Sequence, residues 1–260
     1  MGHANCIVQI VLSTGSLPRK ADMMPIAEQA ETKNRLLRAL SPTAFANFAP
    51  YLEAVMLPLK HVLVEMDRPT EHVCFITSGL ASMVATSGTE TIEVGHIGFE
   101  GMTGEHLALM SDRTPNRTFM QVAGTGYLMR ASVFTEFLND DIATRKLFVN
   151  YVQSCTLQLA HSALSNGRFS LQKRLARWLL MVHDRTEGDD LRLTHKFLGI
   201  MLGVRRSGVT DQLHILEGTL AIKATRGNVH VNRRSKLEEI AGASYGTPER
   251  EYNRLIDARS

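Results

Sequence analysis

The sequence predicts an α+β protein in which a β-rich N-terminal part, one long helix and a helix-turn-helix with a β-hairpin follow one another. Three observations predict this order. Short alternating segments separated by regular glycines occupy residues 55–134, helical periodicity extends over 140–166, and two short amphipathic helices flank a glycine turn within 193–218. An apolar content of 44% and a charged content of 21% are ordinary for a globular protein.

The first 30 residues mix Ser, Gly, Pro and small apolar residues without a sustained period, so residues 1–30 are expected to be a poorly ordered extension. No apolar run is long enough to span a bilayer, and no basic residue precedes the short apolar run 6–12, so neither membrane insertion nor secretion is expected. The three cysteines, Cys6, Cys74 and Cys155, are odd in number and far apart. They predict no disulfide framework and no metal site, and they favour a reducing cytoplasm.

Residues 31–136 are predicted to form a β-roll or barrel with a helical lead. The lead carries Leu36, Leu37 and Leu40 at helical spacing, followed by a new helix start at Ser41-Pro42. Alternating segments then appear at 62–64, 73–76 and 81–84, separated by glycines. Short strands at regular spacing with glycine turns are typical of such a roll.

Residues 137–167 are predicted to form one long helix. Its apolar residues Phe148, Val152, Cys155 and Leu159 are spaced four, three and four, which is the a/d spacing of a helix–helix seam. The seam either packs on its own domain or joins two copies of the chain. We favour the dimer seam.

Residues 168–240 are predicted to form a winged helix-turn-helix, followed by a C-terminal tail at 241–260. Thr194 is a suitable N-cap for the first short helix, and Gly203 can take the left-handed conformation that ends it. Val209, Leu213 and Leu216 share one face of the second helix. The alternating segments after it turn at 226–228, as the hairpin of a wing would.

The polar residues of this module predict contact with double-stranded DNA, because a helix-turn-helix places its second helix in the major groove. The predicted contact residues are Arg205, Arg206, Ser207, Thr210, Asp211 and Arg226. Residues 168–236 carry 14 basic and 6 acidic side chains, whereas the others carry 15 and 20. This asymmetry suggests a polyanionic partner for the C-terminal third alone. The alternative is a regulatory module whose winged helix binds a protein.

The sequence predicts neither an enzyme nor a metal site. It contains no phosphate-binding loop, no nucleophile elbow and no His/Glu set at metal-ligand spacing. No catalytic or metal-binding residue is therefore assigned.

Four motifs, in this order, resemble the Crp/Fnr family of bacterial transcription regulators. They are Cys-Phe-Ile-Thr-Ser-Gly-Leu at 74–80, Gly-His-Ile-Gly-Phe-Glu-Gly-Met at 95–102, Arg-Leu-Ala-Arg-Trp-Leu at 174–179 and the helix-turn-helix at 194–217. The resemblance implies a cyclic-nucleotide-binding-like β-roll as sensor, a long dimerisation helix and a winged helix-turn-helix. It also implies a homodimer on a two-fold DNA site, with RNA polymerase as a further partner.

The resemblance assigns roles to individual residues of the helix-turn-helix. Arg206 matches the arginine that reads a guanine, a contact worth about 1–3 kcal/mol of discrimination. Ser207 and Asp211 depart from the family pattern, so the operator is expected to differ from that of the cyclic AMP receptor protein. Thr194 and Arg226 match contacts to the DNA backbone, which position the protein without specifying sequence.

The sensor is less well matched. The residues nearest to the family's nucleotide pocket are Gly98, Glu100, Arg117 and Thr118. The bulky Phe119 replaces a small residue, so these four either bind a cyclic nucleotide or serve as structural hydrogen-bonding groups. Three scattered cysteines do not supply the ligands of an iron–sulfur cluster. The histidines of the roll, His61, His72, His96 and His106, do not specify haem, so the effector is left open.

Overall fold

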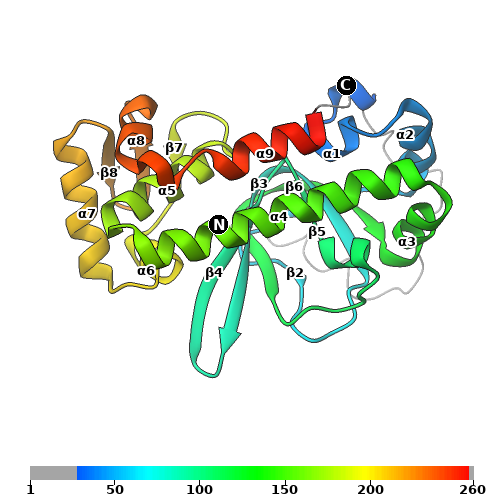
Figure 1. Cartoon of the computed structure of the whole chain (residues 1–260), viewed down its shortest axis with the longest axis horizontal. Helices are drawn as coiled ribbons and strands as arrows, with labels where there is room; N and C mark the ends of the chain where they lie inside the picture. The colour runs from blue at the N-terminus through cyan, green and yellow to red at the C-terminus, as the bar shows by residue number, and fades with distance from the viewer. Residues whose placement is uncertain (1–27, 258–260) are drawn as a thin grey trace, which may run out of the picture.

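The computed structural model describes residues 28–257, so nearly all of the expected extension 1–30 lies outside the described residues. The chain forms two halves connected by the long helix α4, Ile142–Arg168 (Figure 1). The roll half comprises residues 28–140, and the helix-turn-helix half comprises residues 171–246. The four-part order expected from the sequence is therefore present.

The roll half begins with short helices that are fixed by a buried asparagine. These are η1 (Gln29–Glu31), α1 (Arg35–Arg38) and α2 (Pro42–Phe48). The Asn34 side chain caps α1 by accepting from the Leu37 amide, and it donates to the carbonyls of Ile76 at 2.8 Å and Gly101 at 2.7 Å. Because each donor and acceptor of this side chain is used, Asn34 fixes the lead helices on the sheet.

The sheet of the roll is antiparallel and has the strand order β1-β6-β3-β4, with β2 paired to β6 and β5 to β3. Its strands are β1 (Glu53–Leu57), β2 (Val62–Val64), β3 (His72–Ser87), β4 (Glu90–Ile97), β5 (Met102–Thr103) and β6 (Arg117–Arg130). The register between β3 and β6 shifts at three places along their length. Such irregularities bend long strands, which lets the sheet curl around an apolar interior that includes Leu57, Ile76 and Met120.

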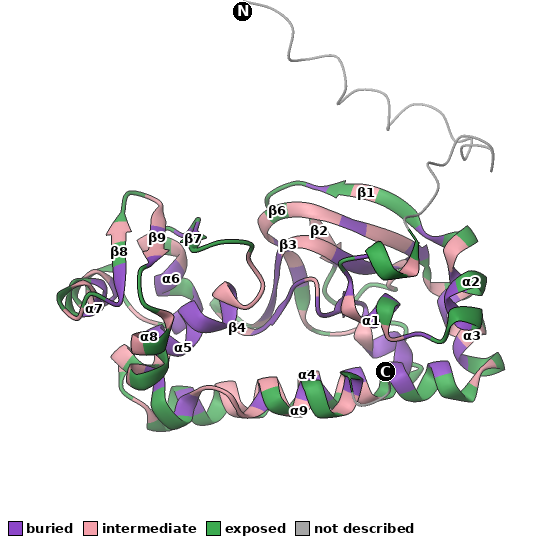
Figure 2. Cartoon of the chain, turned by 90° about the horizontal axis from the view of Figure 1, so that it is seen from above, coloured by how far each residue is buried: buried purple, intermediate pink, exposed green. Residues whose placement is uncertain are grey.

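Helix α3 (Ala131–Asp140) and α4 close the roll through an aromatic cluster. The Phe148 ring of α4 lies 4.9 Å from that of Phe134, 6.0 Å from that of Phe75 and 6.1 Å from that of Phe48. No part of Phe148 is exposed. The first half of α4 is therefore anchored in the roll core, while its outer face is exposed (Figure 2).

The helix-turn-helix half is built on α5 and a small sheet. Its elements are α5 (Leu171–His183), β7 (Asp190–Leu191), α6 (His195–Leu202), α7 (Arg206–Gly218), β8 (Ile222–Thr225), β9 (Asn228–Val231) and α8 (Arg234–Ala241). The three strands have the order β7-β9-β8. Leu175, Leu179, Leu198, Val209 and Leu213 meet in its core.

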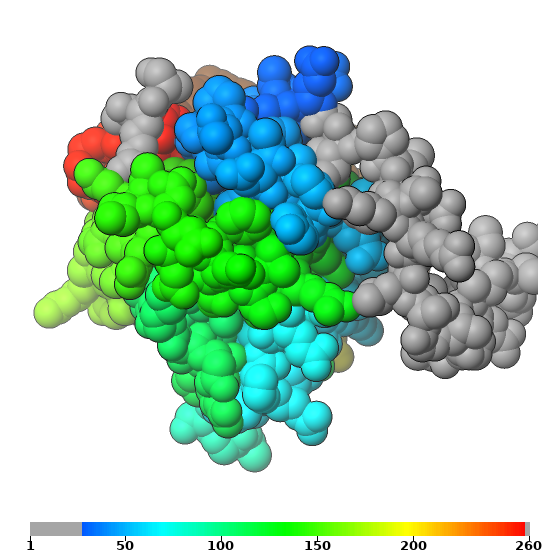
Figure 3. All heavy atoms as spheres, turned by 90° about the vertical axis from the view of Figure 1, so that its right-hand side faces the viewer, coloured from blue at the N-terminus to red at the C-terminus, as the bar shows by residue number. Residues whose placement is uncertain are grey.

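The segment predicted only as a C-terminal tail, 241–260, is helical over most of its described residues. It forms a 3-10 turn at Gly242–Ser244 and then α9, Thr247–Ile256, which lies along α4 (Figures 1 and 2). At the far end of the roll half, α1 and α2 lie near the end of α9 (Figure 3). Among the helices of residues 28–257, none combines the length and the hydropathy needed to cross a bilayer.

Candidate nucleic-acid interface

The turn between α6 and α7 has the geometry that the sequence predicts. The Thr194 hydroxyl accepts from the Phe197 amide at 3.2 Å and so caps α6. Gly203 ends that helix at φ +62° and ψ 38°, a left-handed conformation that favours glycine. The Val204 amide then donates to the Gly199 carbonyl at 2.9 Å, which completes a tight turn.

Helix α7 buries one face and exposes the other. Val209, Leu213 and Leu216 are at most 1% exposed and belong to the core, as predicted. The residues at the start of the opposite face are free to meet a ligand; the exposed ones are Arg205, Arg206, Ser207 and Asp211. A helix held from behind with its N-terminal turns exposed can enter a groove of DNA.

Thr210 differs from these neighbours because its hydroxyl already has two partners. It donates to the Arg206 carbonyl at 3.1 Å and lies 3.0 Å from His195 Nδ1, and its side chain is half-buried. The contact with His195 connects α6 to α7. Thr210 therefore holds the two helices in place, and its expected contact with DNA stays a prediction.

The wing is tied to both the sheet and α7. Glu217 Oε1 accepts from the Ala224 amide at 2.8 Å, which fastens strand β8 to α7. Asp190 accepts from Asn228 Nδ2 at 2.7 Å and from His230 Nδ1 at 3.1 Å, and these bonds lower the pKa of Asp190. With its base fixed in this way, the hairpin presents Arg226, exposed, at its turn.

A groove of about 760 Å³ separates α7 from the wing and brings predicted residues together. Thr194, Arg206 and Arg226 all line it. Sequence reasoning missed two further lining residues, Lys196 and His214. Lys196 lies two positions after the capping Thr194, and this closeness in sequence could have indicated that Lys196 faces the groove. Three cationic side chains, Lys196, Arg206 and Arg226, therefore line the groove together with one carboxylate, Glu217.

The residues predicted to line an effector pocket take up different partners. The Glu100 carboxylate accepts from the Gly98 amide at 3.0 Å and from Arg185 Nε at 2.6 Å. Arg117 is exposed, with its Nε 3.3 Å from Glu65 Oε1. Thr118 is only 2% exposed and lies within β6. The assignment of Gly98, Glu100, Arg117 and Thr118 to an effector pocket stays a prediction.

A cavity of about 130 Å³ lies between the roll and α4, and sequence reasoning did not identify it. Glu105 and His106, from the 3-10 helix Glu105–Leu109, line it together with His96 and Cys155. Burial raises the pKa of Glu105 to about 7 and lowers that of His106, an effect that the charge of Asp112 partly offsets. His106 Nε2 lies 2.9 Å from Thr70 Oγ1, whereas its buried Nδ1 has no protein partner. The cavity is thus lined by two groups that can exchange a proton or form a hydrogen bond, the carboxyl of Glu105 and the imidazole of His106.

The two cysteines of residues 28–257 are protonated thiols at neutral pH. Burial raises the pKa of Cys74 to about 12 and raises the pKa of Cys155 further still. Within the described part of the chain, no group of three or more His, Cys, Asp or Glu residues is arranged to hold a metal ion. Neither thiol has the thiolate character that redox sensing requires.

The four residues of the expected dimer seam each precede, by one position in the sequence, a residue on the exposed face of α4. Phe148 is enclosed in its own roll core, while Val152, Cys155 and Leu159 are half-exposed and line the cavity beside Glu105. The exposed stripe has the same four-three spacing, shifted by one position; it consists of Val149, Gln153, Thr156, Ala160, Ala163 and Gly167. Phe148 is thus unavailable to a partner.

Comparison with known domains and structures follows the same division of the chain. The model of the Crp-like helix-turn-helix domain matches residues 173–240. A search of the curated proteins finds no relative of the sequence.

Solved structures extend the likeness to most of the chain. A regulator of the Crp/Fnr family from Eubacterium rectale superimposes with a TM-score of 0.63 at 16% identity, over 81% of this chain and 99% of its own. FixK2 from Bradyrhizobium japonicum gives 0.65 at 14% identity, over 74% and 98%. The c-di-GMP-responsive regulator CLP from Xanthomonas campestris gives 0.56 at 15%, over 74% and 99%. At such identities the likeness establishes the fold.

Proposed function

We propose that this chain, which has the fold of the Crp/Fnr-type transcription regulators and carries a Crp-like helix-turn-helix domain, acts as a homodimeric regulator that binds a two-fold DNA site. The observation that carries the proposal is the groove in which Thr194, Arg206 and Arg226 meet. It combines an exposed helix start with a basic wing. Its role is regulatory rather than catalytic, in the cytoplasm, with RNA polymerase as a further partner.

Within this interface we divide the residues by what they contact. Arg206 reads a base, and its neighbours Arg205, Ser207 and Asp211 are exposed beside it at the start of α7. The wing Arg226 and the cap Thr194 contact phosphates and set the register. Thr210 acts by holding α6 against α7 through His195.

The dimer forms through the exposed stripe of α4 that runs from Val149 to Gly167. Its small side chains, such as Ala160 and Ala163, allow two helices to approach closely. The half-exposed Val152 and Leu159 flank the stripe. Pairing along α4 places two copies of α7 on one two-fold axis, as a palindromic operator requires.

The effector acts at the cavity beside Glu105, where the roll meets α4. Its volume of about 130 Å³ is below the roughly 300 Å³ typical of small-molecule sites. An effector of nucleotide size would therefore have to displace α4 from the roll. Such a displacement would reach α7 through α5, whose Arg174 and Arg177 bond to Asn166 and Ser162 of α4, and would change the orientation of α7.

The decisive experiment is selection of an operator from random duplexes, followed by affinity measurements with Arg206→Ala. The variant is expected to lose about 1–3 kcal/mol of discrimination at one base pair of each half-site. Its affinity for random duplex DNA should stay close to that of the wild type. Arg254→Ala, which removes an exposed arginine of α9, is the matched control. If Arg206→Ala keeps the full operator preference, Arg206 does not read a base.

A further inference from the structure

Helix α9 is not predicted by the sequence. Its position means that the chain crosses between the two halves twice. The first crossing joins α4 to α5 at residues 168–171, and the second joins the Gly242–Ser244 turn to α9. The matched helix-turn-helix domain ends at residue 240, before the second crossing. The helix-turn-helix half is therefore tethered to the roll half at both of its ends (Figures 1 and 2).

Helix α9 packs on α4 and on the core of the roll half, and Glu249 in its first turn also lies near Arg185 of the helix-turn-helix half. Tyr252 and Ile256 are 8% and 1% exposed and belong to the core cluster of the roll. The Tyr252 hydroxyl donates to the Glu100 carbonyl at 2.5 Å, and Asn150 of α4 donates to the Leu255 carbonyl at 3.1 Å. The helix is thus part of the roll half in packing, although it follows the other half in sequence.

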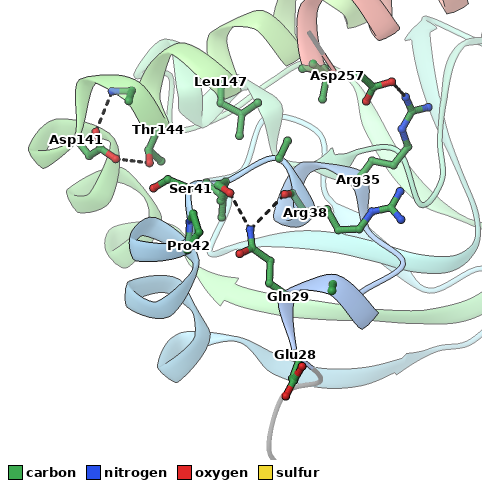
Figure 4. A pocket seen from close by; sticks show the side chains of 15 residues that line it. Glu28, Gln29, Arg35, Arg38, Ser41, Pro42, Asp141, Thr144, Leu147 and Asp257 are labelled. Atoms are coloured by element: carbon green, nitrogen blue, oxygen red, sulfur yellow. Dashed lines mark hydrogen bonds and ion pairs between the residues drawn. The ribbon is translucent and has the colours of Figure 1, made fainter. Parts of the chain in front are cut away.

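The outer end of α9 is held by Arg35 of α1. Its guanidinium lies 4.5 Å from the centre of the Tyr252 ring, donates to Asn253 Oδ1 at 2.8 Å and forms an ion pair with Asp257. Figure 4 shows the Arg35 side chain pointing toward Asp257 at the edge of a groove of about 990 Å³. The helix is consequently fixed at its middle and at its C-terminal end.

Glu100, in the roll, bonds to both α9 and the helix-turn-helix half. Its carbonyl accepts from Tyr252 of α9, and its carboxylate pairs with Arg185, which follows α5 in the helix-turn-helix half. Both charged side chains of this pair are about nine-tenths buried, at 11% and 9% exposure. Gly98 permits the pairing, because a Cβ at that position would lie 2.9 Å from the Arg185 side chain.

We infer that α9 is an intramolecular latch that holds the helix-turn-helix half against the roll half and so fixes the direction in which α7 points. A domain attached by one linker can rotate about it, whereas a second attachment packed into the other domain's core removes most of that freedom. The groove face of α7 stays exposed in the latched state. The latch therefore sets the orientation of α7 without covering it.

Trp178 is a built-in reporter of the closed arrangement, since it is the single tryptophan of the chain. It belongs to α5, is 4% exposed, and donates from Nε1 to Glu93 Oε1 of the roll at 2.7 Å. His96 lies against the same ring, with centroids 5.2 Å apart. Separation of the halves would expose the indole, shift its emission to longer wavelength and increase its quenching by acrylamide.

The test compares full-length Tyr252→Ala with wild type and with Arg254→Ala, which alters an exposed α9 side chain that pairs with Glu251 of the same helix. Amide hydrogen exchange is measured for α9, with β3 as the reference for an intact roll, and Trp178 fluorescence is measured in parallel. In Tyr252→Ala we expect α9 amides to exchange at least tenfold faster and acrylamide quenching to rise severalfold, with β3 unchanged. The control should match wild type. No DNA is needed, so the result is independent of the proposed function.

A second variant, Asp257→Lys, tests the inference if Tyr252→Ala also destabilises the roll. It places a second positive charge beside Arg35 at the half-exposed end of α9, away from the core. Faster exchange in α9 with a smaller rise in quenching is expected. The inference is overturned if either variant with an intact roll speeds exchange in α9 while Trp178 keeps its wild-type emission and quenching. It is also overturned if both variants leave α9 exchange unchanged.

Discussion

Glu105 lines the cavity between the roll and α4, so its titration should affect the stability of their packing. Burial raises its pKa from 4.5 to about 7 in the folded protein. The folded state then binds the proton more tightly than the unfolded chain, so stability is lost as pH rises from about 4.5 through 7. Above pH 7 this loss is on the order of 3 kcal/mol.

Glu105→Gln should remove that pH dependence, because a glutamine stays neutral throughout the range. We expect the unfolding free energy of the variant relative to wild type to rise by about 2–3 kcal/mol between pH 5 and pH 8. Denaturant titrations at the two pH values measure it. Glu136→Gln on the exposed face of α3 serves as control. Parallel pH profiles for wild type and Glu105→Gln would contradict the assignment.

At the scale of residues, sequence reasoning succeeded where the signal was local. The cap at Thr194 and the turn at Gly203 depend on neighbours within a few positions, and the structure confirms both. The partner of Glu100 is Arg185, 85 residues away, and nothing in the local sequence indicates the pairing. The cavity beside Glu105 likewise exists only once α4 packs on the roll.

At the scale of elements, the turn between α6 and α7 depends on Gly203. An L-residue at φ +62° costs about 1–2 kcal/mol, so Gly203→Ala should lower the unfolding free energy by that amount and weaken operator binding. Gly218→Ala is the matched control, because Gly218 is in α7 and a Cβ there meets nothing within 4 Å. Thermal unfolding compares the two. Equal effects of both substitutions would show that the turn tolerates a side chain.

The seam on α4 illustrates a general difficulty of sequence interpretation. Of the apolar stripe predicted at a/d spacing on α4, Phe148 is enclosed in the core of the roll, whereas Val152, Cys155 and Leu159 are half-exposed beside it. The exposed stripe of Thr156, Ala160 and Ala163 has weak hydrophobicity and is recognised only from the structure. The helix itself was predictable, and the dimer seam through Val152, Cys155 and Leu159 stays a prediction.

The exposed stripe makes a direct prediction about assembly. Ala160→Glu places a carboxylate from each protomer in the proposed seam, where the two like charges repel each other and lose solvation. We expect the dimer to dissociate at micromolar concentration, as measured by sedimentation velocity. Asn139→Glu, which adds the same charge on exposed α3, should remain dimeric. If Ala160→Glu remains dimeric, the two protomers must pair through a different surface.

At the scale of the whole molecule, the order of the parts was predictable and the path of the chain between them was not. Glycine-separated strands, a long periodic helix and a capped helix pair are separate local patterns. Helix α9 offers only Tyr252 and Ile256 as large core residues, and the surface they pack on comes from the other end of the chain. Leu80 of β3 is similarly shared, because it packs in the core of the helix-turn-helix half.

The uneven distribution of charge predicts how binding depends on salt. The basic third of the chain should release counterions when it neutralises phosphates, which gives a steep negative slope of log affinity against log salt. Arg226→Gln removes one phosphate contact per protomer, and the slope should become shallower by roughly 2 for the dimer. Titration of binding to random duplex DNA measures both slopes.

Arg254→Gln supplies the control for this titration. It removes the same charge from exposed α9, on the roll half and remote from the groove, so it should leave the slope unchanged. A wild-type slope near zero would favour the alternative of a protein partner, since that partner releases no condensed counterions. Equal slopes for Arg226→Gln and wild type would instead show that the wing turn does not contact phosphate. The phosphate contacts would then be made by Thr194 and Lys196.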